Sequence, residues 1–135
     1  MRKARNNRDK NLEKTVNEIL KSRSRSKIYV YLIRKNGAKT EEIIKGTNLH
    51  PSTVRETLSK MYDQKLIYRK KIKNDSIGKN PYMYHAIPPV KLLKKYASEL
   101  EDKLNNLASI NLTNHDKNYR TVKIKIREGV DDIWI

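Results

Sequence analysis

The stretch TEEIIKGTNLHPSTVRETLSKMYDQKLI, residues 40–67, restricts the fold more than any other part of the chain. Within it Val54, Leu58 and Met61 recur at helical spacing, which predicts a helix with one buried face. Pro51 stands in the first turn of that helix, where the missing amide donor does no harm. A shorter helical segment precedes it and β-rich sequence follows it, so the stretch predicts a helix-turn-helix that leads into a strand.

The ends of these two helices can be placed approximately. Thr40, followed by two acidic residues, is predicted to cap the first helix, and Gly46 to end it after barely two turns. The start of the second helix stays open. His50 is a poor cap, whereas Thr53 and Glu56 match a capping box one turn later.

Residues 1–24 are predicted to form a basic N-terminal arm and a short helix. MRKARNNRDK has no apolar period and predicts a disordered arm, which either follows a neighbouring DNA groove or only aids solubility. Apolar residues at helical spacing predict the short helix over residues 12–20. A second helix is predicted to begin with Ser24 or Ser26 as its cap and to end at Gly37.

A change of period after these helices predicts a hairpin. LIYRKKIK and PYMYHAI are β-rich, and the segment NDSIGKN between them is rich in turn residues. Residues 25–87 are therefore predicted to form a winged helix-turn-helix domain with a basic loop at the tip of its wing. Tyr82 and Tyr84 alternate on one side of the second strand, where we expect them to pack beneath the wing rather than to stack on bases.

The C-terminal part is predicted to add a long helix over residues 88–110 and a β tail over residues 111–135, in which Val122, Ile124 and Ile126 share one face. Apolar positions of the long helix follow a 4-3-4-3 spacing, typical of a short coiled coil. The fold class is thus α+β and mostly helical: a winged helix-turn-helix with a long C-terminal dimerisation helix and a short β tail. The expected dimerisation seam consists of Leu93, Ala97, Leu100, Leu104 and Leu107.

The charge of the chain indicates its kind of partner. It carries 31 Lys and Arg against 15 Asp and Glu, a formal net charge of +16. Such an excess favours a polyanionic partner, above all nucleic acid, although it can also reflect a lysine-rich proteome. Cys is absent, which excludes disulfides and thiolate catalysis, and the three histidines lack metal-ligand spacing. We therefore expect no enzyme, no cofactor and no metal.

The outward face of the helix that begins near Pro51 is the predicted DNA contact. Arg55 is the best candidate for a base contact, because its planar fork can bridge O6 and N7 of guanine. Ser52 and Thr53 suit phosphate contacts at the helix start, and lysines of the wing suit phosphate or minor-groove contacts. The predicted DNA-binding residues are Ser52, Thr53, Arg55, Glu56, Ser59 and Lys60 on the helix and Lys70, Lys71, Lys73, Lys79 and Asn80 on the wing.

The segment KIYVYLIRKNGAKTEEIIKGTNLHPSTVRETLSKMYDQKLIYRK, followed by GKNPYMYHAIPP and the long helix, resembles the archaeal sugar-responsive TrmB-type transcription regulators over residues 27–107. The resemblance implies a winged-helix regulator of transcription. Lys65 stands where that family usually has Gly, so this residue must accept a left-handed backbone or the bend must differ. The large effector domain of full-length relatives is absent, and we therefore expect no small-molecule effector.

We accordingly predict a homodimer that binds double-stranded DNA sequence-specifically, with its two recognition helices at half-sites about one helical turn apart or a multiple of it. The main alternative is an architectural, chromatin-type protein that coats DNA without sequence preference. Another is a protein-interaction module or RNA binder built on a winged scaffold. No stretch approaches the roughly 18–20 apolar residues that span a bilayer, so we expect no membrane partner and a cytoplasmic, nucleoid-associated protein.

Overall fold

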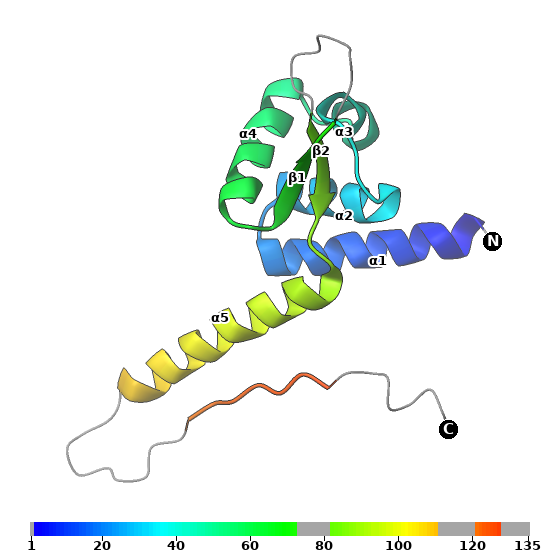
Figure 1. Cartoon of the computed structure of the whole chain (residues 1–135). Helices are drawn as coiled ribbons and strands as arrows, with labels where there is room; N and C mark the ends of the chain where they lie inside the picture. The colour runs from blue at the N-terminus through cyan, green and yellow to red at the C-terminus, as the bar shows by residue number, and fades with distance from the viewer. Residues whose placement is uncertain (1, 73–81, 111–120, 128–135) are drawn as a thin grey trace, which may run out of the picture. The chain divides into compact units, whose positions relative to one another are not determined.

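The computed structural model describes residues 2–72, 82–110 and 121–127, and for residues 2–9 it describes the helical backbone alone. Within these ranges the chain forms five helices and one two-stranded antiparallel hairpin (Figure 1). The predicted order of helices and strands of a winged helix-turn-helix is confirmed. The elements are α1 (Arg2–Leu20), α2 (Arg23–Lys35), α3 (Thr40–Thr47), α4 (Pro51–Asp63), β1 (Ile67–Lys71), β2 (Tyr82–Ala86) and α5 (Pro89–Ile110).

The central helix of the first compact unit, Met1–Pro88, is α2. It contacts α1, α3, α4 and β2, so its apolar residues, among them Ile28 and Leu32, are almost fully buried (Figure 1). The hydroxyl of Tyr29 donates a 2.8 Å hydrogen bond to the main-chain oxygen of Ile87, which ties α2 to the end of the hairpin. Burial raises the pKa of Tyr29 to about 12.

The helix α1 begins much earlier than expected. Residues 2–10 are helical, so the prediction of a disordered arm is wrong. These residues include neither Pro nor Gly, and adding residues to a helix that is already formed costs far less than nucleating a new one. α1 packs on α2, where Val16 is buried, and it belongs to the same compact unit as the winged helix-turn-helix.

The N-cap of α2 is Ser22 and not Ser24 or Ser26 as predicted. Its hydroxyl oxygen accepts a 3.3 Å hydrogen bond from the amide of Arg25. Ser26 instead lies buried inside the helix and donates a 2.7 Å bond to the main-chain oxygen of Ser22. A serine within a helix commonly bonds to the carbonyl four residues earlier, and periodicity alone does not distinguish this role from a cap.

The helix α3 also differs at both ends from the prediction. Its N-cap is Lys39 instead of Thr40, and it continues past Gly46 to the left-handed residue Asn48. Gly46 therefore does not end the helix. It lets α3 approach α2 closely, because a Cβ at this position would overlap the ring of Tyr31.

Each of the first four helices is followed by a residue other than Gly with a positive φ. Asn36, with a φ of 54°, is the left-handed cap of α2, and the predicted Gly37 follows it with a φ of 110°. Lys65 has a φ of 60°, which confirms that it accepts a left-handed backbone at the bend between α4 and β1. The other two such residues are Lys21 and Asn48.

The hairpin of β1 and β2 pairs Arg69 with Tyr84 and Lys71 with Tyr82. A single bridge joins Ala38 to Tyr84 through hydrogen bonds of 3.0 and 2.8 Å, so the chain before α3 also contacts the wing. Tyr84 is buried and Tyr82 is half-buried. The prediction that Tyr84 packs beneath the wing is thus confirmed.

The helix α5 belongs to the second compact unit, Pro89–Ile135, and confirms the predicted long helix. Part of its predicted seam is exposed: Leu93 is 46% and Leu107 is 63% exposed, whereas Ala97 is buried. No described helix is long and apolar enough to cross a membrane.

Residues 121–127 form an extended segment that pairs with no strand among the described residues, so the predicted strand is wrong in this range. The predicted alternation is confirmed, since every second residue is half-buried and the others are exposed. The side-chain amide of Asn105 accepts a 2.6 Å hydrogen bond from the amide of Val122 and donates a 3.1 Å bond to its oxygen. The carboxylate of Glu101 accepts a 3.0 Å bond from the amide of Ile124. Side chains of α5 thus replace a partner strand.

Candidate nucleic-acid interface

The inner and outer faces of α4 are divided as predicted. Val54 and Met61 are fully buried, and Leu58 is 3% exposed. Thr53 is half-buried. The other predicted contact residues of this helix are all exposed: Ser52, Arg55, Glu56, Ser59 and Lys60.

The exposed face of α4 has two different flanks. On one flank the ammonium of Lys60 lies 3.2 Å from the carboxylate of Glu56, an exposed pair on successive turns. On the other flank Arg55, Ser59 and Tyr62 follow a helical stripe and line a hollow that faces the hairpin. The structure therefore separates the predicted contact residues into a paired group and a group that faces the wing.

The start of α4 resolves the open question about its cap. His50 is the N-cap residue, and its Nδ1 accepts a 3.3 Å hydrogen bond from the amide of Ser52. The hydroxyl of Ser52 lies 2.7 Å from the same Nδ1 atom. The imidazole thus replaces the hydroxyl or carboxylate that usually caps a helix, and it fixes Ser52 at the start of the outer face.

The lysines of the wing point to opposite sides of it. Successive strand residues alternate between faces, so Lys71 shares the inner face with Arg69, while Lys70 shares the outer face with Tyr68. The ammonium of Lys70 lies 6.0 Å from the centre of the Tyr68 ring. Both lysines are exposed. The remaining predicted wing residues, Lys73, Lys79 and Asn80, lie outside the described residues.

On the outer face of the wing, the rings of Tyr68 and His85 stack with their centres 5.2 Å apart. Burial, and then the nearby charge of Lys70, lowers the pKa of His85. A Cβ at Gly37 would overlap the His85 ring, so the chain that precedes α3 also lies against this side chain. His85 is therefore a packing residue of the wing base.

Sequence analysis did not identify Arg69 as a site residue. Its guanidinium carbon lies 4.3 Å from the centre of the Tyr62 ring and 4.4 Å from that of the Tyr82 ring. It also lines the hollow of about 260 Å³ beside α4. One signal was available in the sequence: strand alternation places this arginine on the inward face of the wing together with Ile67, where an apolar residue is the usual choice. The residues that line this hollow are Thr40, Arg55, Leu58, Ser59, Tyr62, Arg69 and Tyr84.

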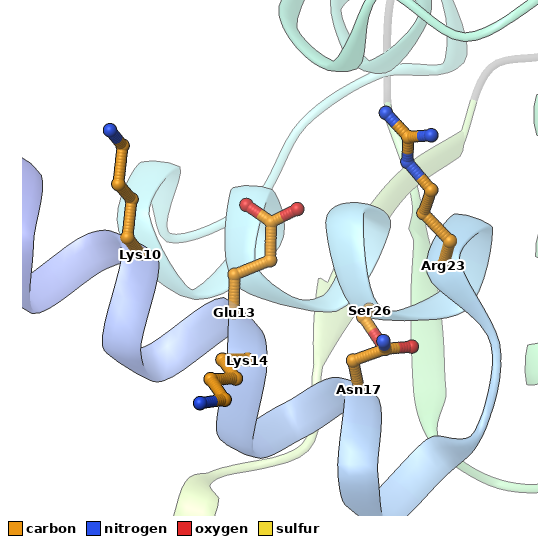
Figure 2. A pocket seen from close by; sticks show the side chains of 6 residues that line it. All are labelled: Lys10, Glu13, Lys14, Asn17, Arg23 and Ser26. Atoms are coloured by element: carbon orange, nitrogen blue, oxygen red, sulfur yellow. The ribbon is translucent and has the colours of Figure 1, made fainter.

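A second hollow, of about 360 Å³, lies between α1 and α2 (Figure 2). Lys10 and Arg23 stand at its opposite ends, with Glu13 between them, and Lys14 points away from Arg23 (Figure 2). These charges do not converge on one point. Among the described residues no group of three or more His, Asp or Glu could hold a metal ion. The geometry therefore favours the outer face of α4 and the adjoining wing as the functional surface.

The comparisons with known proteins agree with this fold. The sequence model of the family described as the sugar-specific transcriptional regulator TrmB matches residues 22–90, just over half of the chain. No curated protein matches the chain.

Solved structures with a similar arrangement include a Staphylococcus aureus protein, MepR, described as a transcription regulator of the multidrug efflux pump MepA. It is 17% identical, with a TM-score of 0.45, and the alignment covers 84% of this chain and 82% of that one. A point mutant of MepR is 18% identical, with a TM-score of 0.49 and the same coverage. The family match covers α2 to the first residues of α5, which includes the whole helix-turn-helix and its wing. The chain belongs to the TrmB family of transcriptional regulators.

Proposed function

We propose that this regulator binds a specific double-stranded DNA sequence as a homodimer, with α4 in the major groove. The observation that carries the proposal is the division of α4: its apolar stripe is buried in the winged domain, and Arg55 projects from the opposite face beside a basic hairpin. A helix held in this way can present side-chain donors to base edges.

Within this proposal each residue has a distinct role. Arg55 contacts a base edge, while Ser52 and Thr53 contact phosphates at the start of the helix. Ser59 lies one turn after Arg55 on the same flank. Glu56 and Lys60 hold each other in position at the second flank, where Lys60 is placed for a phosphate.

The wing supplies contacts that do not depend on base sequence. Lys70 and Lys71 lie on opposite faces of β1, so together they bring positive charge to both sides of the hairpin. We assign them to phosphates or the minor groove, together with Lys73, Lys79 and Asn80.

We propose that α5 joins the two subunits as a short coiled coil through Leu93, Ala97, Leu100, Leu104 and Leu107. The exposure of Leu93 and Leu107 supports this, because both lie on the predicted apolar seam and a paired helix would remove them from water. A two-fold dimer presents two α4 helices to the two halves of a palindromic site.

A second candidate function follows from the charge alone. A net charge of +16 is sufficient for an architectural protein that coats DNA without sequence preference. Selection of bound sequences from a random duplex pool separates the two functions. Enrichment of a palindrome supports the specific regulator, and a pool that stays random supports the coating protein.

Two substitutions refine the selection experiment. Arg55→Ala is expected to reduce the preference between the selected duplex and random duplex by about 10-fold or more, because one base contact is worth roughly 1–3 kcal/mol. Lys71→Ala is expected to weaken binding to both duplexes alike. Equal losses on both duplexes for Arg55→Ala would remove this residue from its role.

The family and fold are those of transcription regulators, which are typically not enzymes, and we propose no catalytic activity and no cofactor for this chain. We also propose no sugar effector. The matched residues, 22–90, coincide with the elements of the DNA-binding domain, so the match gives no support to a sugar site. We place the protein in the cytoplasm with the nucleoid.

A further inference from the structure

We propose that Arg69 binds a backbone phosphate of DNA in the hollow between α4 and the wing, which it shares with Arg55. This inference rests on the proposed binding of duplex DNA. It adds a phosphate contact at the base of the wing.

The lining of the hollow has the chemistry of an anion site. Arg55 from α4 and Arg69 from β1 contribute two guanidinium groups, and four further residues carry hydroxyls: Thr40, Ser59, Tyr62 and Tyr84. None of the described lining residues is acidic. Such a lining favours an anion over a cation as the occupant.

The Arg69 side chain is exposed, but two aromatic rings restrain it before any ligand arrives. The guanidinium carbon of Arg69 lies over the ring of Tyr62 of α4, 4.3 Å from its centre, and over the ring of Tyr82 of β2, 4.4 Å from its centre. An arginine restrained by such contacts loses less conformational entropy when it binds than a freely rotating lysine does.

The ring contacts also limit how the guanidinium of Arg69 can bind a ligand. Aromatic rings against the guanidinium leave its N–H groups, which lie in the plane of the group, as the means of binding. An arginine carries five N–H donors. These donors suit the oxygens of a phosphate, to which guanidinium groups bind in a two-pronged manner.

The location of the hollow identifies the phosphate as part of DNA. It opens beside Arg55 and Ser59, the flank of α4 that we propose for the major groove. The phosphates of a duplex border that groove on both sides. A helix inside the groove and a wing beside it therefore bring the hollow to the backbone, where Arg69 would fix the position of α4.

The test combines a protein variant with a change in single phosphates. A series of duplexes is prepared from the sequence selected above, and in each one a single phosphate is replaced by an uncharged methylphosphonate. Several phosphates are expected to be sensitive in the unaltered protein, and among them we expect one position per half-site, weakened by about 10- to 100-fold, that belongs to Arg69. In Arg69→Ala the affinity for the unmodified duplex is expected to fall by a similar factor, and replacement at that position to have no further effect.

Two controls separate this contact from general loss of charge or fold. Lys71→Ala removes a cation from the same face of β1 but leaves the hollow intact, so the position identified with Arg69 must stay sensitive in this variant. Tyr62→Leu removes one ring contact and keeps the arginine, and we expect a roughly 2- to 5-fold loss of affinity. Circular dichroism establishes that each variant is folded, and Arg69→Lys replaces Arg69→Ala in the same scan if the alanine variant does not fold.

Three results would overturn the inference. The first is Arg69→Ala, or its lysine replacement, binding the duplex as tightly as the unaltered protein. The second is every methylphosphonate weakening both proteins by the same factor. The third combines two measurements: inorganic phosphate raises the melting temperature of the unaltered protein but not that of Arg69→Ala, and the two proteins bind the duplex with equal affinity. This result would assign the hollow to a free anion. Absence of duplex binding by the unaltered protein would overturn the proposed function, and this inference with it.

Discussion

The helices α4 and α5 both carry an apolar stripe, and the two stripes differ in how far their own compact unit covers them. Val54 and Met61 of α4 are fully buried within the winged domain. In α5, Leu93 and Leu107 remain 46% and 63% exposed. The winged domain therefore has a closed core of its own, whereas the proposed seam of α5 is left partly open among the described residues. Folding of the first unit and dimerisation through the second are expected to be separable.

The largest expected effect is in the core of the winged domain. Met61→Ala is expected to lower the free energy of unfolding by about 2–5 kcal/mol, because it removes a fully buried side chain and leaves a cavity. Urea denaturation measures this change. Ile110→Ala is the matched control on α5, where the side chain is 74% exposed, and its effect should stay within about 0.5 kcal/mol. Similar losses for both variants would contradict the contrast between the two units.

A smaller loss is expected where α3 approaches α2. Gly46→Ala is expected to lower the free energy of unfolding by about 1–3 kcal/mol, since its methyl group would overlap the ring of Tyr31 and force the helices apart. Lys45→Ala, at an exposed neighbouring position, serves as the control. Helix propensity alone would make Gly46→Ala more stable, because Ala favours a helix more than Gly does. A more stable variant would therefore show that the two helices are not in close contact.

The wing base is expected to respond to pH. Burial and the charge of Lys70 lower the folded-state pKa of His85 below 6.5, so the unfolded chain takes up this proton first as the pH falls. The contribution of His85 to stability is thus greatest above pH 6.5 and declines as the pH falls toward its folded-state pKa. Titration of the His85 ring by NMR measures the shift. In Lys70→Gln the pKa should move upward, and an unchanged value would mean that Lys70 has no part in the shift.

A substitution in the seam of α5 is expected to change the stability of the winged domain least. Leu100→Lys should convert the dimer to monomers in sedimentation experiments, because a charge in an apolar seam opposes pairing. Amide hydrogen exchange in α2 and α4 should be unchanged. A dimer that persists would place the subunit contact elsewhere, and faster exchange in α2 and α4 would show that the winged domain depends on its partner.

Sequence patterns predicted the secondary structure well where burial and period act together. The stripe of Val54, Leu58 and Met61 predicted α4, and the β-rich segments LIYRKKIK and PYMYHAI on either side of a turn-rich segment predicted the wing. The helix ends were less predictable. A glycine at this point of a helical pattern usually indicates the end of the helix. Gly46 instead lies within α3, where its lack of a side chain leaves room for the ring of Tyr31, and no local pattern reveals this contact.

Two further features depend on contacts between distant residues. The alternation of residues 121–127 correctly predicts which side chains are half-buried and which are exposed. The hydrogen bonds of this segment, however, come from Asn105 and Glu101 on α5 and not from another strand. In the same way, the ring contacts of Arg69 require residues from α4 and β2 that are separated along the chain. Sequence analysis found Arg55 because a helix period is sufficient to place it, and it missed Arg69 because the surrounding rings come from other elements.

Lys65 determines how freely the wing can move relative to α4. Its φ of 60° lies in a region that costs a residue with a side chain roughly 1–2 kcal/mol, and its amide donates a 3.1 Å hydrogen bond to the oxygen of Tyr62. A glycine would relieve that strain, but it would also open many other backbone angles at the bend. The lysine makes this bend a stiff joint. The lysine thus leaves fewer backbone angles open at this joint than a glycine would, so a wing bound to DNA would have less freedom to follow a change in groove width.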